Sequence, residues 1–260
     1  MRYIDVHCHL DGDCYGSMDD LFSRLADAGV EKVIAAGYDL ATSELSAALA
    51  DKYPACYFTA GFHPTELSKY HEGDLDRIAD LSRHPKCVAI GEIGLDYHYP
   101  DTTDKPLEKE MFIRQMELAS SLGMPIQIHS RDCAEDMLTI LQEHRDLLSN
   151  GVLMHCYSHS PETAAILEKM GLYFSFGGTS TYSGSKKPRR SLKALRMDRL
   201  MTETDSPYLS PASQHGIFPN TPLNIPEIAA NMAALKEVSL ETMTETVWAN
   251  AHRLFPKLNN

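Results

Sequence analysis

The residues Asp5-Val-His-Cys-His9 place two histidines two positions apart at the end of an apolar segment rich in strand-forming residues. Side chains at positions i and i+2 of a strand leave the same face, so His7 and His9 project together and could hold one metal ion. Asp5 lies one pleat deeper on that face, and Cys8 points to the opposite one. The pair alone is a weak signal, because histidine is a common polar residue as well as the commonest metal ligand.

More strongly polar residues follow later apolar segments, each at the point where a strand is expected to end. They are His63, Glu92, Asp96, His129, Arg131, His155, Glu203 and Asp205. Four imidazoles and two carboxylates can bind two divalent ions if one carboxylate bridges them, and Glu92 is the natural bridge. We expect one ion to be held by His7, His9, Glu92 and Asp205, and the other by Glu92, His129 and His155.

The donor atoms of these two sets bear on the identity of the metal. Imidazole nitrogens dominate, which favours Zn, Mn, Co or Ni, although Mg is compatible if carboxylates and water supply most of the ligands. A catalytic site also keeps open positions for water and substrate. The sequence therefore predicts two divalent metal ions in a catalytic rather than a structural site.

Eight short apolar runs of strand-forming residues recur along the chain. They are Tyr3–His7, Lys32–Ala36, Cys56–Ala60, Val88–Gly91, Pro125–His129, Gly151–His155, Tyr173–Gly177 and Leu200–Thr204. Helical patterns fill the intervals, among them Met18–Ala28, Leu107–Leu122, Ala134–Leu147 and Glu162–Met170. This alternation predicts parallel strands joined by crossover helices.

A doubly wound open sheet would give the same local pattern, so the placement of the polar residues decides between the two folds. In a barrel, the catalytic residues lie at the C-terminal ends of many strands. We therefore expect an α/β fold of the TIM-type (β/α)8 barrel class, closed by C-terminal helices at Ile225–Leu235 and Leu240–Leu254. The length of 260 residues is close to the roughly 250 of one such barrel. Because no linker or repeat interrupts the chain, residues 1–260 are expected to form a single domain.

Composition narrows the setting in which the chain works. The six cysteines show no Cys-x-x-Cys pair, which fits free thiols in a reducing compartment better than a disulfide framework. The N-terminus shows no charged and apolar leader, and no apolar run approaches the ~20 residues needed to span a bilayer. We expect a soluble, cytoplasmic protein with no membrane partner, and no obligate protein partner is evident.

The formal charge of −12 argues against general affinity for polyanions, but the charge is unevenly placed. The segment from Lys186 to Arg199 holds seven basic residues and one acid, a net +6 that leaves −18 for the remainder. Such a segment could attract phosphates to one side of an acidic body. A solvated helix face is the alternative explanation for any one of these residues.

Taken together, the motifs resemble those of TatD-family metal-dependent deoxyribonucleases of the amidohydrolase superfamily. The matching stretches cover almost the whole chain in order: Asp-Val-His7-Cys-His9-Leu, Gly-Phe-His63-Pro64, Gly91-Glu92-Ile-Gly-Leu-Asp96-Tyr, His129-Ser-Arg131, Met-His155-Cys-Tyr-Ser, Glu203-Thr-Asp205-Ser-Pro and Asn250-Ala-His-Arg-Leu-Phe255. The resemblance implies a TIM-type barrel with a divalent-metal site at its mouth, and hydrolysis of DNA or related phosphodiesters.

The resemblance also separates branches of the superfamily. Many amidohydrolases bridge their metals with a carbamylated lysine after the fourth strand, where this chain has Glu92, and Lys86 stands at the wrong end of that strand. This favours the TatD-like branch. Two departures are visible: the family usually offers a basic residue just before the Asn-x-Pro that is Asn220 to Pro222 here, and His159 stands where relatives tend to have a small residue.

Three functions stay open at this point. The first is hydrolysis of phosphodiester bonds by a metal-activated water, with Asp205 and Glu92 as catalytic residues, Asp205 taking the water proton, and His63 and Arg131 binding the substrate phosphate. The second is an amidohydrolase-type hydrolysis of a C–N or C–O bond in a small molecule, because the fold does not fix the substrate. The third is a partner-binding barrel with a vestigial site. His63 and Arg131 favour the first, because they suit phosphate oxygens better than an amide.

Overall fold

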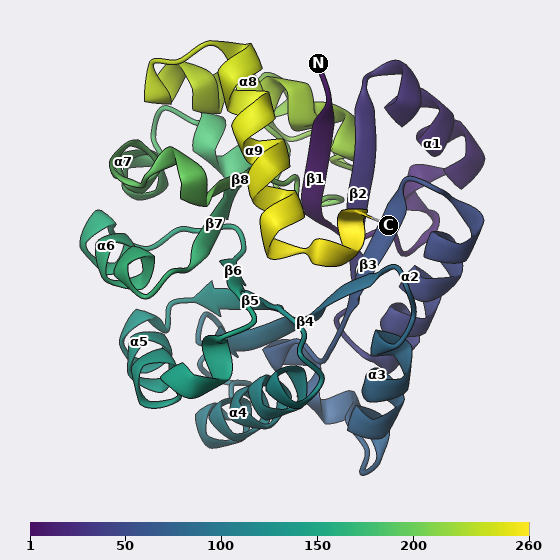
Figure 1. Cartoon of the computed structure of the whole chain (residues 1–260), viewed down its shortest axis with the longest axis vertical. Coiled ribbons are helices and arrows are strands. Elements are labelled where there is room, and N and C mark those ends of the chain that lie inside the picture. Colours follow the sequence, from purple (N-terminus) through teal and green to yellow (C-terminus); the bar gives the residue numbers. More distant parts are fainter. Residues whose placement is uncertain (260) are drawn as a thin grey trace.

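Eight strands lie side by side in one parallel sheet, in the order of the sequence, in this computed structural model (Figure 1). The structure describes residues 1–259 apart from the side chain of Asp13, and Asn260, the last residue of the expected domain, lies outside the described residues. The strands are β1 (Tyr3–Cys8), β2 (Val30–Ala36), β3 (Cys56–Ala60), β4 (Cys87–Asp96), β5 (Ile126–Arg131), β6 (Val152–Met154), β7 (Tyr173–Phe176) and β8 (Leu200–Thr202). Most strand residues are buried, as expected where helices cover a parallel sheet.

Side chains join the last strand to the first. The Thr202 hydroxyl of β8 donates to the Ile4 carbonyl oxygen of β1 at 2.7 Å. Just beyond β8, the backbone nitrogens of Thr204 and Asp205 donate to the Asp5 carboxylate and the His7 carbonyl oxygen, each at 3.0 Å. These bonds bring the start and the end of the sheet together, and the prediction of a TIM-type (β/α)8 barrel is confirmed.

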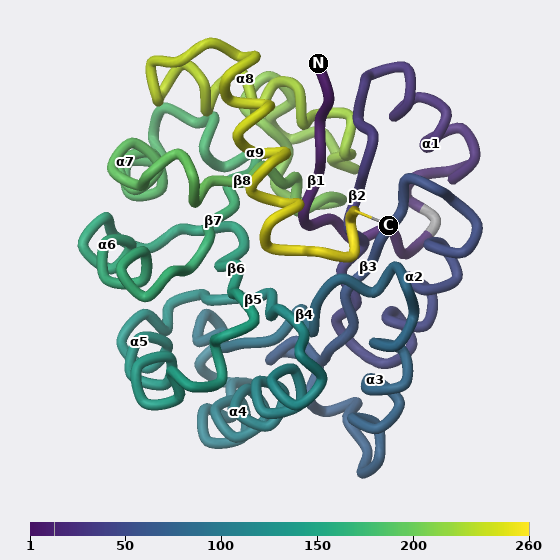
Figure 2. Tube along the Cα trace, viewed as in Figure 1, coloured from purple at the N-terminus to yellow at the C-terminus, as the bar shows by residue number. Residues whose placement is uncertain are grey.

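Helices alternate with the strands and form the outer layer (Figure 2). They are α1 (Met18–Asp27), α2 (Leu40–Lys52), α3 (Asp74–Ser82), α4 (Lys105–Ser121), α5 (Ala134–Glu143), α6 (Pro161–Lys169), α7 (Lys186–Ala194), α8 (Ile225–Lys236) and α9 (Leu240–Leu254). Side-chain oxygens that accept backbone N–H groups explain several starts, for example Asp39 before α2 and Ser160 before α6. None of the described helices is long and apolar enough to cross a bilayer.

Several boundaries differ from those expected, and the following bear on the site or on the helices. β4 runs to Asp96 rather than stopping at Gly91, β8 stops at Thr202, and the helix expected to reach Leu147 ends at Glu143 before a short 3-10 turn. Glu92 therefore lies inside a strand. The apolar residues Ile93 and Leu95 explain the longer β4, because both are fully buried.

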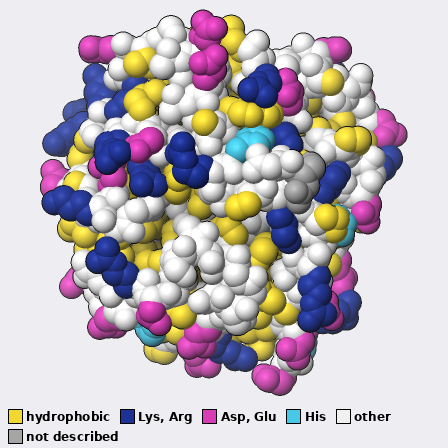
Figure 3. Space-filling model, in the orientation of Figure 1, with side chains coloured by type: hydrophobic (Ala, Val, Ile, Leu, Met, Phe, Trp, Pro, Cys, Tyr) yellow, Lys and Arg dark blue, Asp and Glu magenta, His cyan; other side chains and the backbone are white. Residues whose placement is uncertain are grey.

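The N-terminal ends of the strands are covered by the end of the chain. α9 and the 3-10 helix η8 (Pro256–Asn259) cross in front of the barrel in Figure 1. The Lys257 ammonium of η8 donates to carbonyl oxygens of Ser82 and His84, which precede β4. We call this N-terminal end of the barrel, covered by α9 and η8, the closed end. On it, Lys and Arg side chains gather at the left, over the region of α6 and α7 (Figure 3). The opposite, C-terminal end of the barrel is where the predicted site residues converge.

Candidate metal and active site

His7 and His9 lie side by side at the C-terminal end of β1. One ring nitrogen of each contacts a polar group on the side away from the mouth. His7 Nδ1 lies 2.7 Å from the Gln127 amide oxygen, and His9 Nδ1 lies 3.1 Å from the Ala36 carbonyl oxygen. Both partners accept hydrogen bonds only, so each ring carries its proton on Nδ1. The Nε2 lone pairs of both rings are thereby directed into the mouth, where they face each other at 3.2 Å.

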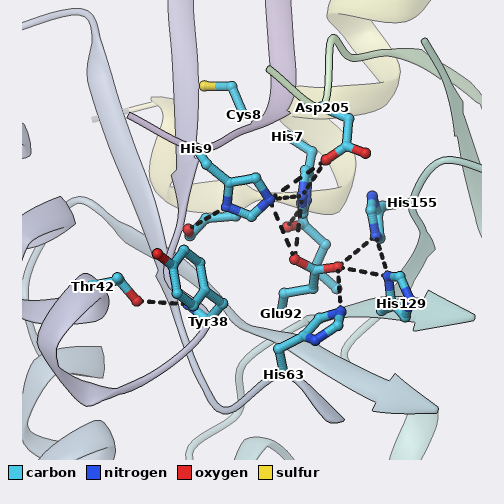
Figure 4. A network of polar contacts seen from close by, with 12 residues as sticks. His7, Cys8, His9, Tyr38, Thr42, His63, Glu92, His129, His155 and Asp205 are labelled. Atoms are coloured by element: carbon cyan, nitrogen blue, oxygen red, sulfur yellow. Dashed lines mark hydrogen bonds and ion pairs between the residues drawn. The ribbon is translucent and has the colours of Figure 1, made fainter. Parts of the chain in front are cut away.

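Two carboxylates complete a four-atom group around these nitrogens (Figure 4). Asp205 Oδ1 lies 3.5 Å from both His7 Nε2 and His9 Nε2. Glu92 Oε2 lies 3.5 Å from the first nitrogen and 3.6 Å from the second. Ligands at the usual metal distances of ~2.0–2.1 Å stand about 3.3 Å apart when they are arranged tetrahedrally. The spacing of these four atoms therefore fits one metal ion.

Glu92 lies at the centre of the cluster and faces it with both oxygens (Figure 4). While Oε2 faces the first pair of histidines, Oε1 lies 2.7 Å from His155 Nε2 and 2.9 Å from His129 Nδ1. Those two ring nitrogens are 3.2 Å apart. His63 Nε2 is also near Oε1, at 3.5 Å. One carboxylate thus joins two groups of nitrogens, as the bridging role requires.

The second pair of histidines is also supported from behind. His129 Nε2 lies 3.0 Å from Asp96 Oδ2, which directs its Nδ1 towards Glu92. His155 Nδ1 faces Glu203 Oε2 at 3.7 Å, and the Ser175 hydroxyl holds that carboxylate at 2.6 Å. Outward partners of this kind orient metal-binding histidines and fix their tautomers.

The backbone around the site shows why these side chains reach one point. An added Cβ on Gly94, whose φ is 144°, would lie 2.0 Å from the His129 carbonyl oxygen, so only glycine allows β4 to approach β5 this closely. Asp205 sits in the turn after β8 with a φ of 53°. The hydroxyl of Thr204 and its backbone nitrogen both donate to the fully buried Asp5, which fixes that turn against β1.

Electrostatics within the cluster divide the histidines. His7 and His63 are held neutral, whereas, against the effect of burial, the neighbouring carboxylates raise the pKa of His9 to about 9 and also raise those of His129 and His155. Burial, followed by the charge of His155, lowers the pKa of His7 to about 3, and burial with the charge of His129 does the same for His63. Burial opposes ionisation of Glu92, but the neighbouring histidines, led by His155, hold its pKa well below the usual range. For Asp205, burial likewise opposes ionisation, but the nearby His9, His155 and His7 rings overcome it and the pKa is lowered.

The donor set fits bound cations. At His7 and His9, and again at His129 and His155, two ring nitrogens face each other at 3.2 Å beside Glu92. Two nitrogens at that distance repel unless a proton or a metal cation lies between them. Groups with metal-binding spacing within the described residues include the combinations His7, Glu92 and His155; His7, His9 and Asp205; and His63, Asp96 and His129.

The predicted substrate-contact residues lie at different depths. The His63 ring is mostly buried and turns Nε2 to Glu92, while its Nδ1 accepts the Thr65 backbone N–H at 3.2 Å. Arg131 is exposed at the end of β5, with its guanidinium carbon 5.6 Å from the Tyr99 ring centre. His63 therefore lines the cluster itself, and Arg131 lies on the rim.

Several supporting residues were missed by the sequence reasoning. Gln127 orients His7, Ser175 holds the carboxylate of Glu203 that faces His155, and Tyr38 places its ring 5.5 Å from that of His9. Gln127 could have been found, because it is a polar residue in the apolar run that ends at His129. Tyr38 gave no comparable signal, since it follows a strand as an ordinary loop aromatic.

Other residues that the sequence singled out lie away from the metal-binding atoms. Lys86 donates to the Ala50 and Tyr53 carbonyl oxygens at the closed end, so it cannot act as a bridging lysine. Asn220 donates to the Thr204 and Tyr208 carbonyl oxygens. His159 bonds to the Ser130 hydroxyl at 2.7 Å on the rim.

The barrel and its mouth of histidines and carboxylates define the class of metal-dependent barrel hydrolases. Residues 4–256 match the family model described as TatD related DNase. The chain belongs to this family. It is 38% identical over 252 residues to the metal-dependent hydrolase YabD of Bacillus subtilis, covering 96% of this chain and 98% of that protein.

Two further relatives carry names that bear on function or fold. The chain is 30% identical over 241 residues to the protein named 3'-5' ssDNA/RNA exonuclease TatD of Escherichia coli, covering 91% of this chain and 92% of that one. The solved structure of YJJV, a TatD homologue from Escherichia coli, superposes with a TM-score of 0.93 at 29% identity over 98% of both chains. The chain is thus a metal-dependent hydrolase of the TatD family.

Proposed function

We propose that this enzyme hydrolyses phosphodiester bonds of single-stranded DNA or RNA, using two divalent metal ions. The observation that carries the proposal is the convergence of imidazole lone pairs on the two oxygens of Glu92, with the opposite nitrogen of each ring facing a polar partner. The name of the Escherichia coli relative supports the choice of nucleic acid as substrate.

The two ions would be held by the two groups of side chains already described. The first group is His7, His9, Glu92 and Asp205, and the second is Glu92, His129 and His155. Divalent ions bound there would supply an activated water and would neutralise charge on the phosphate. The nitrogen-rich donor set favours Zn, Mn, Co or Ni, with Mg as a weaker candidate.

Asp205 is suited to receive the proton of the attacking water. One of its oxygens faces His7 and His9, and the turn that carries it is tied to β1 through its own backbone nitrogen. Because the surrounding histidines keep its carboxylate ionised, it is ready to accept a proton at neutral pH. Glu92 holds the two groups of histidines in register for the same step.

His63 and Arg131 would bind the phosphate of the substrate. His63 presents Nε2 at the cluster, and the exposed Arg131 can reach outward from the rim towards the next phosphate. We expect His63→Ala to lose activity on phosphodiesters while its metal content stays intact. His71→Ala is the matched control, because His71 is exposed on the outer surface. Unchanged turnover in His63→Ala would remove it from substrate binding.

The direct test is metal content together with activity. Protein purified without chelator is analysed for bound metals and assayed on single-stranded DNA and on bis(p-nitrophenyl) phosphate, with Mn, Co, Ni, Zn and Mg added in turn. We expect about two ions per chain and hydrolysis of both substrates, and loss of both properties in a His7→Ala, His9→Ala double variant. A metal-replete protein that cleaves neither substrate would contradict the proposal.

A cytoplasmic location is also proposed. It rests on four buried cysteines, Cys8, Cys56, Cys87 and Cys133, which are free thiols, because a protein with buried thiols fits a reducing compartment.

A further inference from the structure

The loop that follows β8 exposes an unusual amount of apolar surface. Nine large apolar side chains are exposed within the described residues, and four of them belong to this loop. They are Tyr208 (59%), Leu209 (42%), Ile217 (56%) and Phe218 (61%). The rings of Tyr208 and Phe218 lie 6.4 Å apart and are tilted by 45°. Apolar groups concentrated in this way usually mark a binding surface.

The loop that carries these rings is held firmly. The Asn220 side chain donates to the carbonyl oxygens of Thr204 and Tyr208, at 2.9 and 2.6 Å. The Ser210 hydroxyl donates to the Ile217 carbonyl oxygen at 2.6 Å, which joins the two halves of the loop. The backbone that carries the rings is therefore held in place, so binding to them costs little ordering of the loop.

This surface borders the mouth of the barrel. The Tyr208 backbone nitrogen donates to the Asp205 carbonyl oxygen at 3.0 Å. Asp11 accepts the Tyr38 hydroxyl at 2.5 Å, and Tyr38 contacts the His9 ring. Partial burial, followed by the charges of Asp11 and Asp205, raises the pKa of Tyr208. Tyr208 thus lies on the same side of the mouth as Tyr38, next to the carboxylates of the site.

We infer that the rings of Tyr208 and Phe218 form a stacking platform for a nucleobase of the single-stranded substrate, next to the phosphate that is cleaved. This inference rests on the proposed function. Aromatic side chains beside a backbone-binding channel are the common means of holding unpaired bases. The nearby charges of Asp11 and Glu66 are negative, which disfavours a phosphate or an anionic membrane surface at this place and leaves a neutral, planar group as the fitting occupant.

A binding experiment without catalysis tests the platform. Chelator-treated protein is titrated with a short single-stranded oligonucleotide carrying 2-aminopurine at its 3' end, and with the same oligonucleotide made abasic there. We expect quenching of 2-aminopurine emission on binding, and weaker binding of the abasic probe by roughly 5- to 100-fold. Phe218→Leu and Tyr208→Leu should reduce quenching and affinity, while Phe218→Trp should retain both. Leu45→Ala removes an exposed apolar side chain on α2 and is the matched control.

The outcomes separate this inference from the proposed function. If the metal-replete parent cleaves single-stranded DNA, the ratio of kcat/KM for DNA to kcat/KM for bis(p-nitrophenyl) phosphate should fall in the two leucine variants, with circular dichroism confirming their fold. Equal binding of abasic and base-bearing probes, or an unchanged ratio, would overturn the platform and leave the proposed hydrolysis intact. A concentration-dependent dimer that Phe218→Leu dissolves would also overturn it, because a second copy would then cover the rings. If the parent cleaves no DNA, the proposed function fails, and the quenching result still decides whether bases stack here.

Discussion

The two ends of the barrel satisfy their buried polar groups in opposite ways. At the closed end, Lys86 donates to three backbone carbonyl oxygens, and Lys257 and Asn250 donate to two each, so these donors have neutral acceptors. At the mouth, histidine nitrogens face one another, as His7 and His9 do at 3.2 Å. The closed end thus pairs these donors within the folded chain alone, whereas the mouth crowds nitrogens and carboxylates together in an arrangement that suits bound cations.

The difference shows how stability and function are divided in one barrel. Donors paired with carbonyl oxygens contribute to folding whether or not a ligand is present. Acceptors that converge on one point oppose folding slightly until a cation binds, and then bind it tightly because they are already in position. Variants at the mouth should therefore change metal affinity and turnover, and variants at the closed end should change stability.

The largest effect is expected from Asp205→Asn. The amide keeps the shape of the side chain and an oxygen that can bind metal, but it cannot accept the water proton. Turnover should fall by roughly 10²- to 10⁴-fold, the usual range for removal of an acid–base group. Steady-state kinetics on bis(p-nitrophenyl) phosphate, with metal measured by mass spectrometry on the same sample, provide the check.

Metal content decides how that result is read. A variant that retains its metal and loses turnover supports proton transfer by Asp205. A metal-replete variant with near-normal turnover would leave Asp205 with ligation only. The comparison of the two ends adds a further expectation: the thermal stability of the metal-free, chelator-treated variant should stay close to that of the parent, because the backbone nitrogen of residue 205 keeps its hydrogen bond to the His7 carbonyl oxygen of β1.

Replacing one amide side chain at each end of the barrel by leucine compares the two ends directly. Gln127→Leu removes the acceptor of His7 Nδ1 and the donor to the Val6 carbonyl oxygen. Asn250→Leu removes the donor to the Met197 and Leu200 carbonyl oxygens. Each should lower the free energy of unfolding by about 1–3 kcal/mol. Only Gln127→Leu should also weaken metal binding, by roughly 10- to 100-fold, which is typical of a lost outer partner. Equal metal affinities, measured by calorimetry, would contradict the comparison.

A smaller effect is expected on the pH dependence of stability, through Glu108 on α4. Its side chain contacts the backbone of β4 next to the mouth. Its carboxylate accepts the Asp96 backbone N–H at 2.8 Å, and burial raises its pKa from 4.5 to about 7. Between these values the folded protein keeps a proton that the unfolded chain releases, so stability falls as pH rises through this window and levels off above it. Glu108→Gln keeps an acceptor oxygen without the charge.

The melting temperature of Glu108→Gln should therefore rise relative to that of the parent between pH 5 and pH 8. Both proteins carry the same histidines, so the difference between their melting curves isolates Glu108. Chelator is present throughout, which keeps metal binding from adding its own pH dependence. A difference that stays constant over this range would show that Glu108 is not protonated in the folded state.

The barrel was predictable because its signals are local and repeated. Each strand is a short apolar run, and the residues that end the runs, such as His129 and Glu92, share the mouth as a consequence of topology. Reasoning from the sequence expected Glu92 just past a strand, whereas it lies inside β4, because the apolar Ile93 and Leu95 keep the strand going. The sequence thus identified Glu92 as a site residue but did not predict that it lies inside a strand.

The supporting partners were harder to predict, because they depend on contacts between distant parts of the chain. Gln127 and His7 are 120 positions apart and meet at 2.7 Å, and no local pattern indicates which nitrogen of His7 is protonated. Arg189 shows the same limit in the other direction. It was grouped with the surface cations, but it donates to the Ser180 carbonyl oxygen at 2.8 Å and so helps to hold the loop after β7.

The smallest effect is expected from the basic segment, which runs from the mouth towards the closed end. The start of α7 lies near the C-terminal end of β7, and its Lys186, Lys187 and Arg190 side chains are exposed. We predict that changing these three to Gln weakens binding of single-stranded DNA at low salt. The slope of log affinity against log salt should become shallower by at most about 2, since each neutralised phosphate contributes roughly 0.7 for a single strand.

The control lies in the same segment at the other end of the barrel. Changing Lys193, Arg196 and Arg199 to Gln removes the same charge, but Arg196 is paired with Asp198 and Arg199 lies over the Tyr173 ring, next to the start of β8. If the field of the whole protein attracts the substrate, both triple variants shift the slope equally. If the mouth binds it, as the comparison of the two ends requires, only the variant at the start of α7 changes the slope. A slope that neither variant alters would return the whole segment to a solvated helix face.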